Sequence, residues 1–463
     1  MNARKVKTVW AFCALLSVAA TSASLAQNAT DVQVPPAGFD AGMITDPHLF
    51  RPTGQPRGIV FLISDAQGWA DADEAQAKAL VARGMAVVGL DLPGYLKGLE
   101  KHPDDDDCAY AIADIEELSK RLQTGGEGDY QLPLIAGRGD GGGLAVALAA
   151  QAPASTIAAV VAADPSAGIA LQAPLCTDAP HETVGGRAVY GLTPGELNVP
   201  VDVTFTAAAT ADARDHVAGL AKDYPDISMA TATGTTDEAL ATALNTRLDA
   251  IDKAEGPLNL PITEMAVDRP ALDTMAIIYS GDGGWRDIDH DMGQALQKSG
   301  VPVIGVDSLR YFWNERKPQE TADDLSRIIR HYKTTWGVKH VVLIGYSFGA
   351  DILPASYTLL PAQDQASVVQ MTLMALSHQR DYVIHVAGWL GMSSGSASDP
   401  TKDLLNVPPR LVQCIYGADD DEDACHDLTD RGYEMIGLTG GHHFDGDYEG
   451  LATHVLNGLK TRL

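Results

Sequence analysis

The sequence predicts two tandem α/β domains, each built on a mostly parallel sheet flanked by helices. In both halves of the 463-residue chain, short β-branched apolar segments alternate with amphipathic or Ala-rich segments. This alternation is typical of a parallel sheet with helices on both faces. The pattern also occurs twice along the chain, which predicts that one fold is repeated.

The repeat is visible in three pairs of segments with a nearly constant spacing. Ser64 corresponds to Ser280 and Asp91 to Asp307, and both pairs are 216 positions apart. The third pair of segments is 208 positions apart, which requires one insertion of eight residues in the first copy. The paired segments are 58–73 with 275–289, 80–96 with 296–312, and 132–149 with 341–357.

This repeat also sets the expected domain boundaries. We expect a first domain at 28–255 and a second at 265–463, joined by a Pro-containing linker at 256–264. Helices are expected near 72–83, 108–122 and 142–152 in the first domain, and near 288–299, 319–335 and 349–357 in the second.

The first 26 residues have the pattern of a secretory signal peptide. A basic segment, "MNARKVK", precedes an apolar one, "TVWAFCALLSVAA", and small residues follow up to Ala26, so cleavage is expected before Gln27. The apolar run is short for a membrane span, and an uncleaved anchor is the alternative. The signal resembles those of bacteria and predicts a periplasmic protein.

Four cysteines remain after this segment is removed, two in each half of the chain. An even number of cysteines in an oxidising compartment favours disulfides. We expect the pairs Cys108–Cys176 and Cys414–Cys425 rather than either of the other two pairings. Metal binding is not expected, because no C-x-x-C or H-x-x-x-H spacing accompanies these cysteines.

The chain is strongly acidic. Its formal net charge is −28, and loss of the three cations in the signal peptide takes it to about −31. Such a surface argues against binding nucleic acid or anionic lipid through a basic face. It is compatible with cationic ligands, although acidic side chains also simply keep a secreted protein soluble.

The chemistry is indicated by the stretch "GYSFG", residues 345–349. In α/β-hydrolases a nucleophilic serine lies on a tight turn between a strand and a helix, in the pattern G-x-S-x-G. The glycines are needed because neighbouring backbone crowds the turn. Here the apolar strand 341–344 precedes the motif and a helical segment follows, so Ser347 is the predicted nucleophile.

A serine needs a base and an orienting acid, which follow it in this fold in the order acid, then histidine. A strand at 410–416 ends in Gly417 and an acidic turn, where Asp420 is the expected acid and Asp419 and Asp421 are rivals. A solvated acidic loop is the alternative interpretation. Near the C-terminus, "GGHH" offers His442 or His443 as the base; the sequence does not separate them, although H-x-F favours His442.

An oxyanion hole is also required for ester hydrolysis. One donor is expected to be the backbone N–H of Phe348, the residue after the nucleophile. The other is expected on the Gly-rich turn after an early strand, "YSGDGGW" at 279–285, where Asp282 is at the usual donor position and Gly283 is next.

The first copy lacks these groups. Gly139 stands in place of the serine, within "GRGDG". Neither 201–215 nor 232–240, opposite the acidic turn and the histidines, carries the matching residues. We therefore expect the first domain to be non-catalytic. The letters "GRGDGG" also match a dinucleotide-binding pattern, but the repeat accounts for these glycines better.

The motifs "SGDGGWRDID", "GYSFGADILP", "HVAGWLG" and "GGHHFDGDY" together resemble the VirJ/AcvB family of bacterial periplasmic virulence-associated proteins. AcvB-type members carry an additional N-terminal half, as this chain does. The resemblance implies an α/β-hydrolase without a cofactor, with Ser347 as nucleophile and His442 or His443 as base. For the orienting acid, the resemblance points to Asp420.

For AcvB-like members the resemblance further implies hydrolysis of lysyl-phosphatidylglycerol, an aminoacylated phospholipid at the membrane surface. The product would be free lysine and phosphatidylglycerol. The alternative function is a non-catalytic periplasmic scaffold that binds components of type IV secretion. The sequence indicates neither the oligomeric state nor the mode of membrane contact.

Overall fold

The structure, a computed structural model, describes residues 41–101, 108–126, 128–193, 197–253, 258–384 and 398–463. The expected signal peptide, part of the expected linker, and the motif that begins at position 385 lie outside these residues. No helix in the described ranges is long and apolar enough to cross a membrane.

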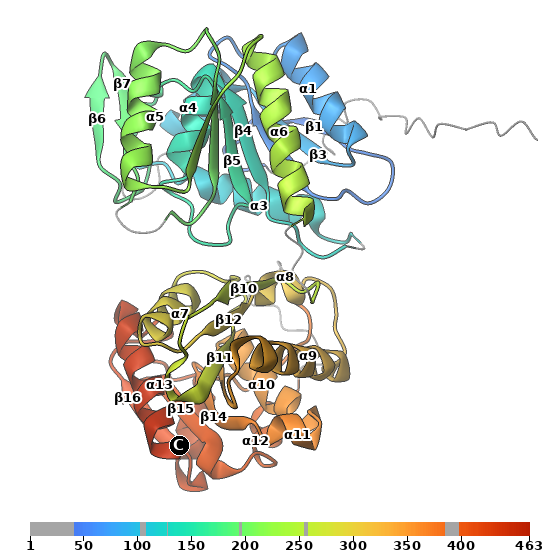
Figure 1. The fold of residues 1–463 in the computed structure, drawn as a ribbon, viewed down its shortest axis with the longest axis vertical. Helices are drawn as coiled ribbons and strands as arrows, with labels where there is room; N and C mark the ends of the chain where they lie inside the picture. Colours follow the sequence, from blue (N-terminus) through green and yellow to red (C-terminus); the bar gives the residue numbers. More distant parts are fainter. Residues whose placement is uncertain (1–40, 102–107, 127, 194–196, 254–257, 385–397) are drawn as a thin grey trace, which may run out of the picture.

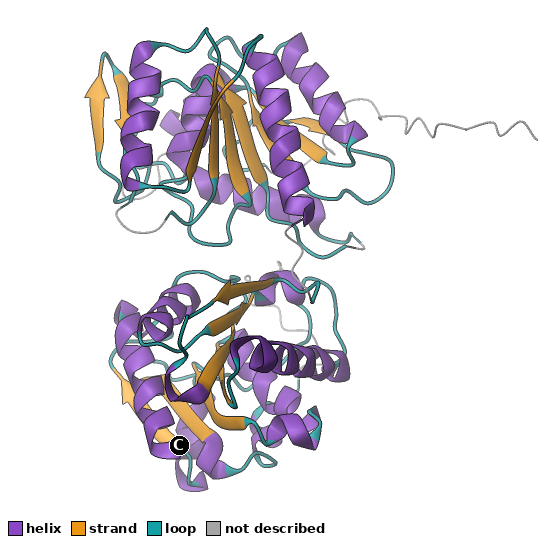
Figure 2. Cartoon of the chain, viewed as in Figure 1, coloured by secondary structure: helices purple, strands orange, loops and turns teal. Residues whose placement is uncertain are grey.

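Two seven-stranded sheets form the cores of two α/β domains (Figures 1 and 2). In the first sheet the strand order is β1-β3-β2-β4-β5-β8-β9, and in the second it is β10-β12-β11-β13-β14-β15-β16. The two orders are equivalent strand by strand. In each sheet only the edge strand that comes first in the order, β1 or β10, is antiparallel to its neighbour. The predicted fold class is therefore confirmed.

The first domain contains strands β1 His48–Phe50, β2 Ile59–Ile63, β3 Ala86–Leu90, β4 Leu134–Arg138, β5 Ala159–Ala163, β8 Val201–Phe205 and β9 Ile227–Thr231, with the hairpin β6 His181–Val184 and β7 Arg187–Tyr190. Its helices are α1 Asp71–Ala82, α2 Leu92–Lys101, α3 Ala111–Gln123, α4 Gly139–Leu148, α5 Ala211–Asp223 and α6 Thr236–Lys253.

The second domain contains strands β10 Ile262–Met265, β11 Thr274–Tyr279, β12 Val303–Val306, β13 His340–Tyr346, β14 Val368–Met374, β15 Val412–Gly417 and β16 Glu434–Leu438. Its α-helices are α7 Ile288–Lys298, α8 Ser308–Tyr311, α9 Pro318–Trp336, α10 Phe348–Leu359, α11 Ala362–Gln365, α12 Thr401–Leu404 and α13 Tyr448–Arg462. Short 3₁₀ segments are η1 Ala271–Asp273, η3 Pro409–Leu411, η4 Ala424–Arg431 and η5 Phe444–Gly446.

The six helices expected from the sequence are present, with ends shifted by up to four residues. The largest shift is at the end of α4, Leu148, and its start at Gly139 directly follows β4 because the tight turn leaves no loop. Central strands such as β2, β3 and β11 are buried along their whole length. This burial is expected for parallel strands covered by helices on both faces.

A tryptophan–glycine contact explains part of the repeat. A side chain at Gly89 would begin 2.2 Å from the ring of Trp69, and one at Gly305 would begin 2.5 Å from the ring of Trp285. Each indole thus lies directly on the backbone of the neighbouring strand. Only glycine leaves room for this contact.

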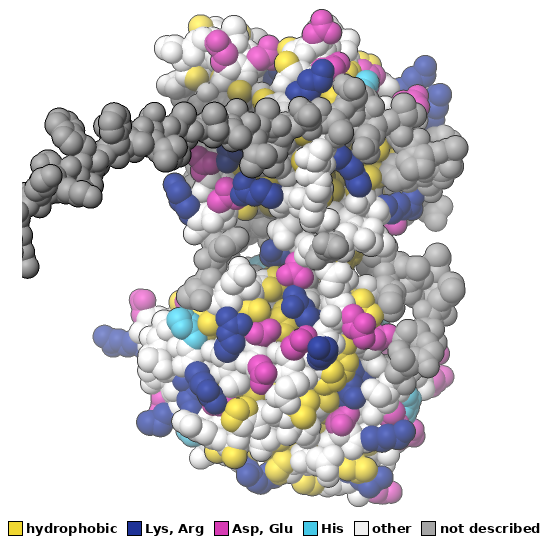
Figure 3. Space-filling model, turned by 90° about the vertical axis from the view of Figure 1, so that its right-hand side faces the viewer, with side chains coloured by type: hydrophobic (Ala, Val, Ile, Leu, Met, Phe, Trp, Pro, Cys, Tyr) yellow, Lys and Arg dark blue, Asp and Glu magenta, His cyan; other side chains and the backbone are white. Residues whose placement is uncertain are grey.

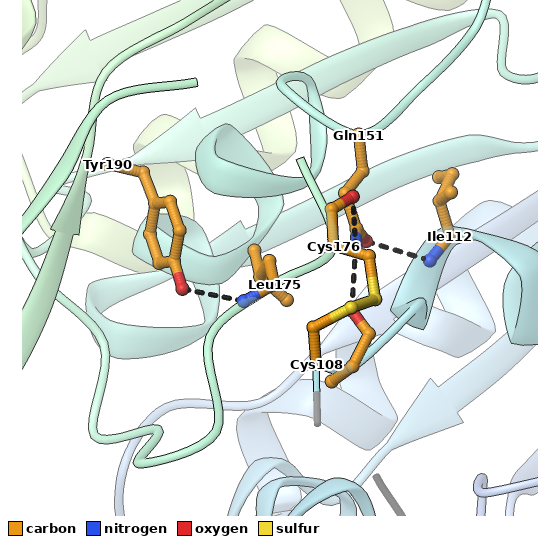
Figure 4. The surroundings of a disulfide bond; sticks show 7 residues. Cys108, Ile112, Gln151, Leu175, Cys176 and Tyr190 are labelled. Carbon is orange, nitrogen blue, oxygen red and sulfur yellow. Dashed lines mark hydrogen bonds between the residues drawn. A yellow bond between two sulfur atoms is a disulfide. The ribbon is translucent and has the colours of Figure 1, made fainter. Parts of the chain in front are cut away.

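Both predicted disulfides are present, Cys108–Cys176 and Cys414–Cys425. Around the first, the Gln151 amide donates to the carbonyl of Ala109 at 2.7 Å and to that of Cys176 at 3.2 Å (Figure 4). Its oxygen accepts the N–H of Ile112 at 3.2 Å. The bridge and this buried amide together join the start of α3 to the loop that contains Cys176.

The first domain also contributes to the core of the second. Tyr130, on the segment between α3 and β4, is 1% exposed and packs among buried side chains of the second domain. Its ring centroid lies 4.8 Å from that of Trp313. Beside it, Asn314 donates to the carbonyl of Gly128 at 2.8 Å, and Arg316 pairs with Asp129 at 3.0 Å. The two domains are therefore joined by a packed interface as well as by the chain.

Candidate active site

Ser347 lies on a sharp turn between β13 and α10, with a backbone φ of 50°. A positive φ is strained for a residue other than glycine and costs on the order of 1–3 kcal/mol. A side chain at Gly345 would begin 2.5 Å from the backbone of Gly349, and one at Gly349 would begin 2.1 Å from the carbonyl of Tyr279. Both glycines of the motif are thus needed to let three backbone segments meet under the serine.

Ser347, His442 and Asp420 form one hydrogen-bonded chain. Nε2 of His442 lies 3.0 Å from Oγ of Ser347, and Nδ1 of the same ring lies 3.2 Å from Oδ2 of Asp420. This is the geometry in which an imidazole removes a proton from a serine while a carboxylate orients the ring. The His442 side chain is 44% exposed, so the serine is reached from the surface.

The second histidine has a different contact. Nδ1 of His443 lies 3.0 Å from the hydroxyl of Tyr346, which also lies 3.3 Å from the carbonyl oxygen of His442. Tyr346 directly precedes the serine, so this contact ties the histidine loop to the nucleophile turn. Asp419 and Asp421, the rival acids, are exposed, whereas Asp420 points toward the ring of His442.

The loops after β15 and β16 are held against each other, which brings the acid to the histidine. A side chain at Gly417 would begin 2.3 Å from the carbonyl of Gly441, so the crossing requires glycine. The N–H of Asp419 donates to the carbonyl of Gly440 at 3.0 Å. The disulfide Cys414–Cys425 then closes the acidic loop on either side of Asp420.

The first domain binds an anionic oxygen at the position that corresponds to the expected oxyanion hole of the second. Oδ1 of Asp65 accepts the N–H of Ala66 at 2.8 Å and that of Asp140 at 2.9 Å. Through the repeat, Asp65 corresponds to Gly281, Ala66 to Asp282, and Asp140 to Phe348. Two backbone donors in the expected positions therefore converge on one anionic oxygen. This register favours the N–H of Asp282 over that of Gly283, whose counterpart is Gln67.

The same carboxylate occupies the space that a serine at position 139 would need. A side chain at Gly139 would begin 2.3 Å from Oδ1 of Asp65, so a serine at 139 and this rotamer of Asp65 exclude each other. In the second domain the counterpart of Asp65 is Gly281, and a side chain there would begin 3.8 Å from Cβ of Ser347. One domain thus has a serine and an open turn, and the other has a carboxylate and no serine.

A buried carboxyl group supports the turn. Oδ2 of Asp289 accepts the N–H of Gly281 at 3.2 Å, and Oδ1 has no hydrogen-bond partner among the described residues. Burial raises the pKa of Asp289 well above its ordinary value, and Asp287, Asp307 and Asp282 add to the rise. A raised pKa extends the pH range in which this carboxyl group is neutral.

Carboxyl groups on and just after the turn 279–285 also act on Tyr346 at longer range. Burial is the first cause of the raised pKa of Tyr346, and the carboxylates of Asp289, Asp282 and Asp287 add to it. On the face drawn in Figure 3, Lys and Arg side chains are interspersed with Asp and Glu. Among the described residues, no group of three or more His, Cys, Asp or Glu side chains is arranged to hold a metal ion.

The strand order and this site define the class of the second domain. A mostly parallel sheet, a serine on the strand–helix turn, and an acid and a histidine on loops after two later strands are the features of an α/β-hydrolase. Residues 273–463 match the family described as "Bacterial virulence protein (VirJ)". This match confirms the resemblance to the VirJ/AcvB family over the second domain.

The chain is also similar to solved α/β structures at low identity. An α/β serine hydrolase without a lid from Xanthomonas campestris has 16% identity and a TM-score of 0.30, covering 44% of this chain and 88% of that one. Est1E from Butyrivibrio proteoclasticus, with ferulic acid bound, has 10% identity and a TM-score of 0.30, covering 44% and 96%. A lipase-esterase related protein from Clostridium acetobutylicum has 16% identity and a TM-score of 0.30, covering 42% and 98%. No curated protein sequence matches the chain significantly.

Proposed function

We propose that the second domain is a serine ester hydrolase. The observation that carries this proposal is the continuous hydrogen-bonded chain from Ser347 through His442 to Asp420. The strained turn that exposes the serine supports it, because strain of this kind persists where function requires it. The turn at Gly281 is a second support, because it is open, whereas its counterpart in the first domain is filled by the Asp65 carboxylate.

The reaction follows from these positions. Ser347 Oγ attacks the acyl carbon while His442 Nε2 takes its proton, and the carbonyl oxygen becomes an oxyanion between the N–H groups of Phe348 and Asp282. The oxyanion collapses, the bond to the alcohol oxygen breaks, and His442 returns the proton to the leaving alcohol. Water then attacks the acyl-enzyme by the same route and releases the acid and the free serine.

We further propose that the acyl group is cationic and that the ester is the lysyl ester of phosphatidylglycerol. The family resemblance supports this substrate, which would yield lysine and phosphatidylglycerol. The carboxylates of Asp282 and Asp287 near Tyr346 support a cationic acyl group, because charge-assisted contacts to ammonium groups are strong. Both disulfides are consistent with an extracytoplasmic protein, and we propose the periplasm.

The test is lysine release from vesicles that contain lysyl-phosphatidylglycerol, measured for protein 27–463 and for Ser347→Ala. Loss of release by at least about a thousandfold in the variant, with an unchanged circular dichroism spectrum, is the expected result. If neither protein releases lysine but the wild type alone cleaves a small activated ester, the hydrolase assignment holds and the lipid substrate is wrong. If neither ester is cleaved, the proposed enzyme is wrong, and binding to secretion components is the function to test.

A further inference from the structure

Arg286, at the end of the turn that carries the proposed oxyanion donor Asp282 (the oxyanion turn, residues 279–286), forms an ion pair with the first domain. Arg286 follows Trp285 at the end of the turn, and its Nη1 donates to both carboxylate oxygens of Glu116 on α3, at 3.0 and 2.9 Å. The two side chains are only 18% and 15% exposed. Lys120, one helical turn further along α3 and 1% exposed, pairs with the same carboxylate at 2.7 Å. A charge-assisted pair in such a site is stronger than one on the surface.

Arg286 also touches the backbone whose position matters for the oxyanion. Its N–H donates to the carbonyl of Gly284 at 3.0 Å, and its carbonyl accepts the N–H of Asp289 at 3.1 Å. A side chain at Gly283 would begin 3.4 Å from the guanidinium nitrogens of Arg286. The guanidinium therefore lies against the peptide next to Asp282. A shift of this group moves the backbone that carries the second oxyanion donor.

The first domain has no arginine at the position that corresponds to Arg286. Its counterpart of Arg286 is Ala70, whose side chain ends at Cβ. The pair with Glu116 is thus a feature that the repeat does not require. It is present only in the domain whose turn faces a serine, and it is supplied by the domain that has none.

We propose that Glu116 of the first domain is a positioning residue for the Ser347 site. Its carboxylate holds Arg286, and Arg286 holds the turn that presents the Asp282 N–H to the oxyanion. The first domain thereby supports catalysis in the second. This inference rests on the proposed serine hydrolase function.

The interface offers a matched control. Arg316 and Asp129 form a second ion pair between the domains, at 3.0 Å, with side chains 29% and 46% exposed. This pair lies beside the packed ring of Tyr130 and does not include the oxyanion turn. Asp129→Asn removes a carboxylate between the domains, as Glu116→Gln does, without touching Arg286.

The experiment compares E116Q and D129N in the full mature chain. For a small activated ester, E116Q is expected to lower kcat by about 10- to 100-fold with KM within about twofold, because small displacements of catalytic groups have effects of this size. D129N is expected to leave both constants within about twofold. Equal effects of the two variants, or a change in KM alone, would overturn the proposal.

A second variant and a second measurement separate positioning from folding. E116Q leaves a buried and a largely buried cation, Lys120 and Arg286, without their shared carboxylate, so E116Q/K120M, which removes one of them, is measured beside it. If this double variant regains the wild-type kcat, Glu116 acts on stability only and the proposal is wrong. Hydrogen–deuterium exchange of residues 280–287 is expected to be faster in E116Q and unchanged in D129N.

The exchange measurement does not depend on activity. If the wild type cleaves no ester, the proposed function fails, and exchange alone then decides whether Glu116 orders this turn. Unchanged exchange in E116Q refutes the positioning role whatever the activity of the wild type.

Discussion

Gly281→Asp is expected to close the second active site in the way that Asp65 closes the first. In the first domain, Asp65 accepts two backbone N–H groups at 2.8 and 2.9 Å. In the second domain the corresponding donors, Phe348 and Asp282, are the proposed oxyanion hole. A carboxylate on residue 281 competes for both donors with the oxyanion of the reaction. It also adds negative charge where negative charge must develop.

The expected loss of activity follows from the number of donors. Loss of one oxyanion donor costs about 10²- to 10³-fold in kcat, so occupation of both is expected to cost about 10⁴-fold or more. The variant is also expected to be less stable by about 1–3 kcal/mol, because the carboxylate and Cβ of Ser347 compete for one space. The first domain shows how close the two groups would be: a side chain at Gly139, the counterpart of Ser347, would begin 2.3 Å from Oδ1 of Asp65.

A double-mutant cycle tests this reasoning. G281D/S347G recreates the arrangement of the first domain and is expected to recover stability, with a coupling energy of about 1–3 kcal/mol. G281A controls for the added Cβ, which would lie 3.2 Å from the ring of Tyr346. Urea unfolding gives the stabilities and cleavage of an activated ester gives kcat. More than a tenth of wild-type activity in G281D would refute the oxyanion assignment, and additive effects on stability in the cycle would refute the competition between the carboxylate and Ser347.

Three further predictions concern the loops and the core around the site. Cys414→Ser with Cys425→Ser removes a bridge across 11 positions, and urea unfolding should show a loss of about 3 kcal/mol together with a lower kcat. His442→Gln should remove about a thousandfold or more of esterase activity and His443→Gln less than about tenfold, so equal losses would contradict the geometry. Burial raises the pKa of Asp351 to about 8 from an ordinary value of 3.8, so its contribution to stability is greatest below pH 4 and is lost as the pH rises toward 8. Asp351→Asn should therefore gain stability relative to the wild type between pH 5 and 8. If the difference in unfolding free energy between the two proteins is the same at pH 5 and at pH 8, Asp351 is not held protonated.

The sequence by itself predicted the repeat, the fold class and Ser347 as the candidate nucleophile. The serine turn is a local feature, because a tight strand–helix turn needs glycines two positions before and after Ser347 whatever surrounds it. The disulfide pairing was also predicted, since two cysteines lie in each half of the chain. The order serine, acid, histidine along the chain limited the remaining candidates to two short loops.

Only the tertiary structure decided between neighbours on those loops. His442 and His443 have the same chemistry and similar local sequence, and the path of the chain past Gly417 determines which ring faces Ser347. Nothing in the neighbouring sequence predicted that Asp65 occupies the place of the missing serine, or that Arg286 pairs with Glu116. Their partners lie 75 and 170 positions away, so they become neighbours only when the strands and domains pack.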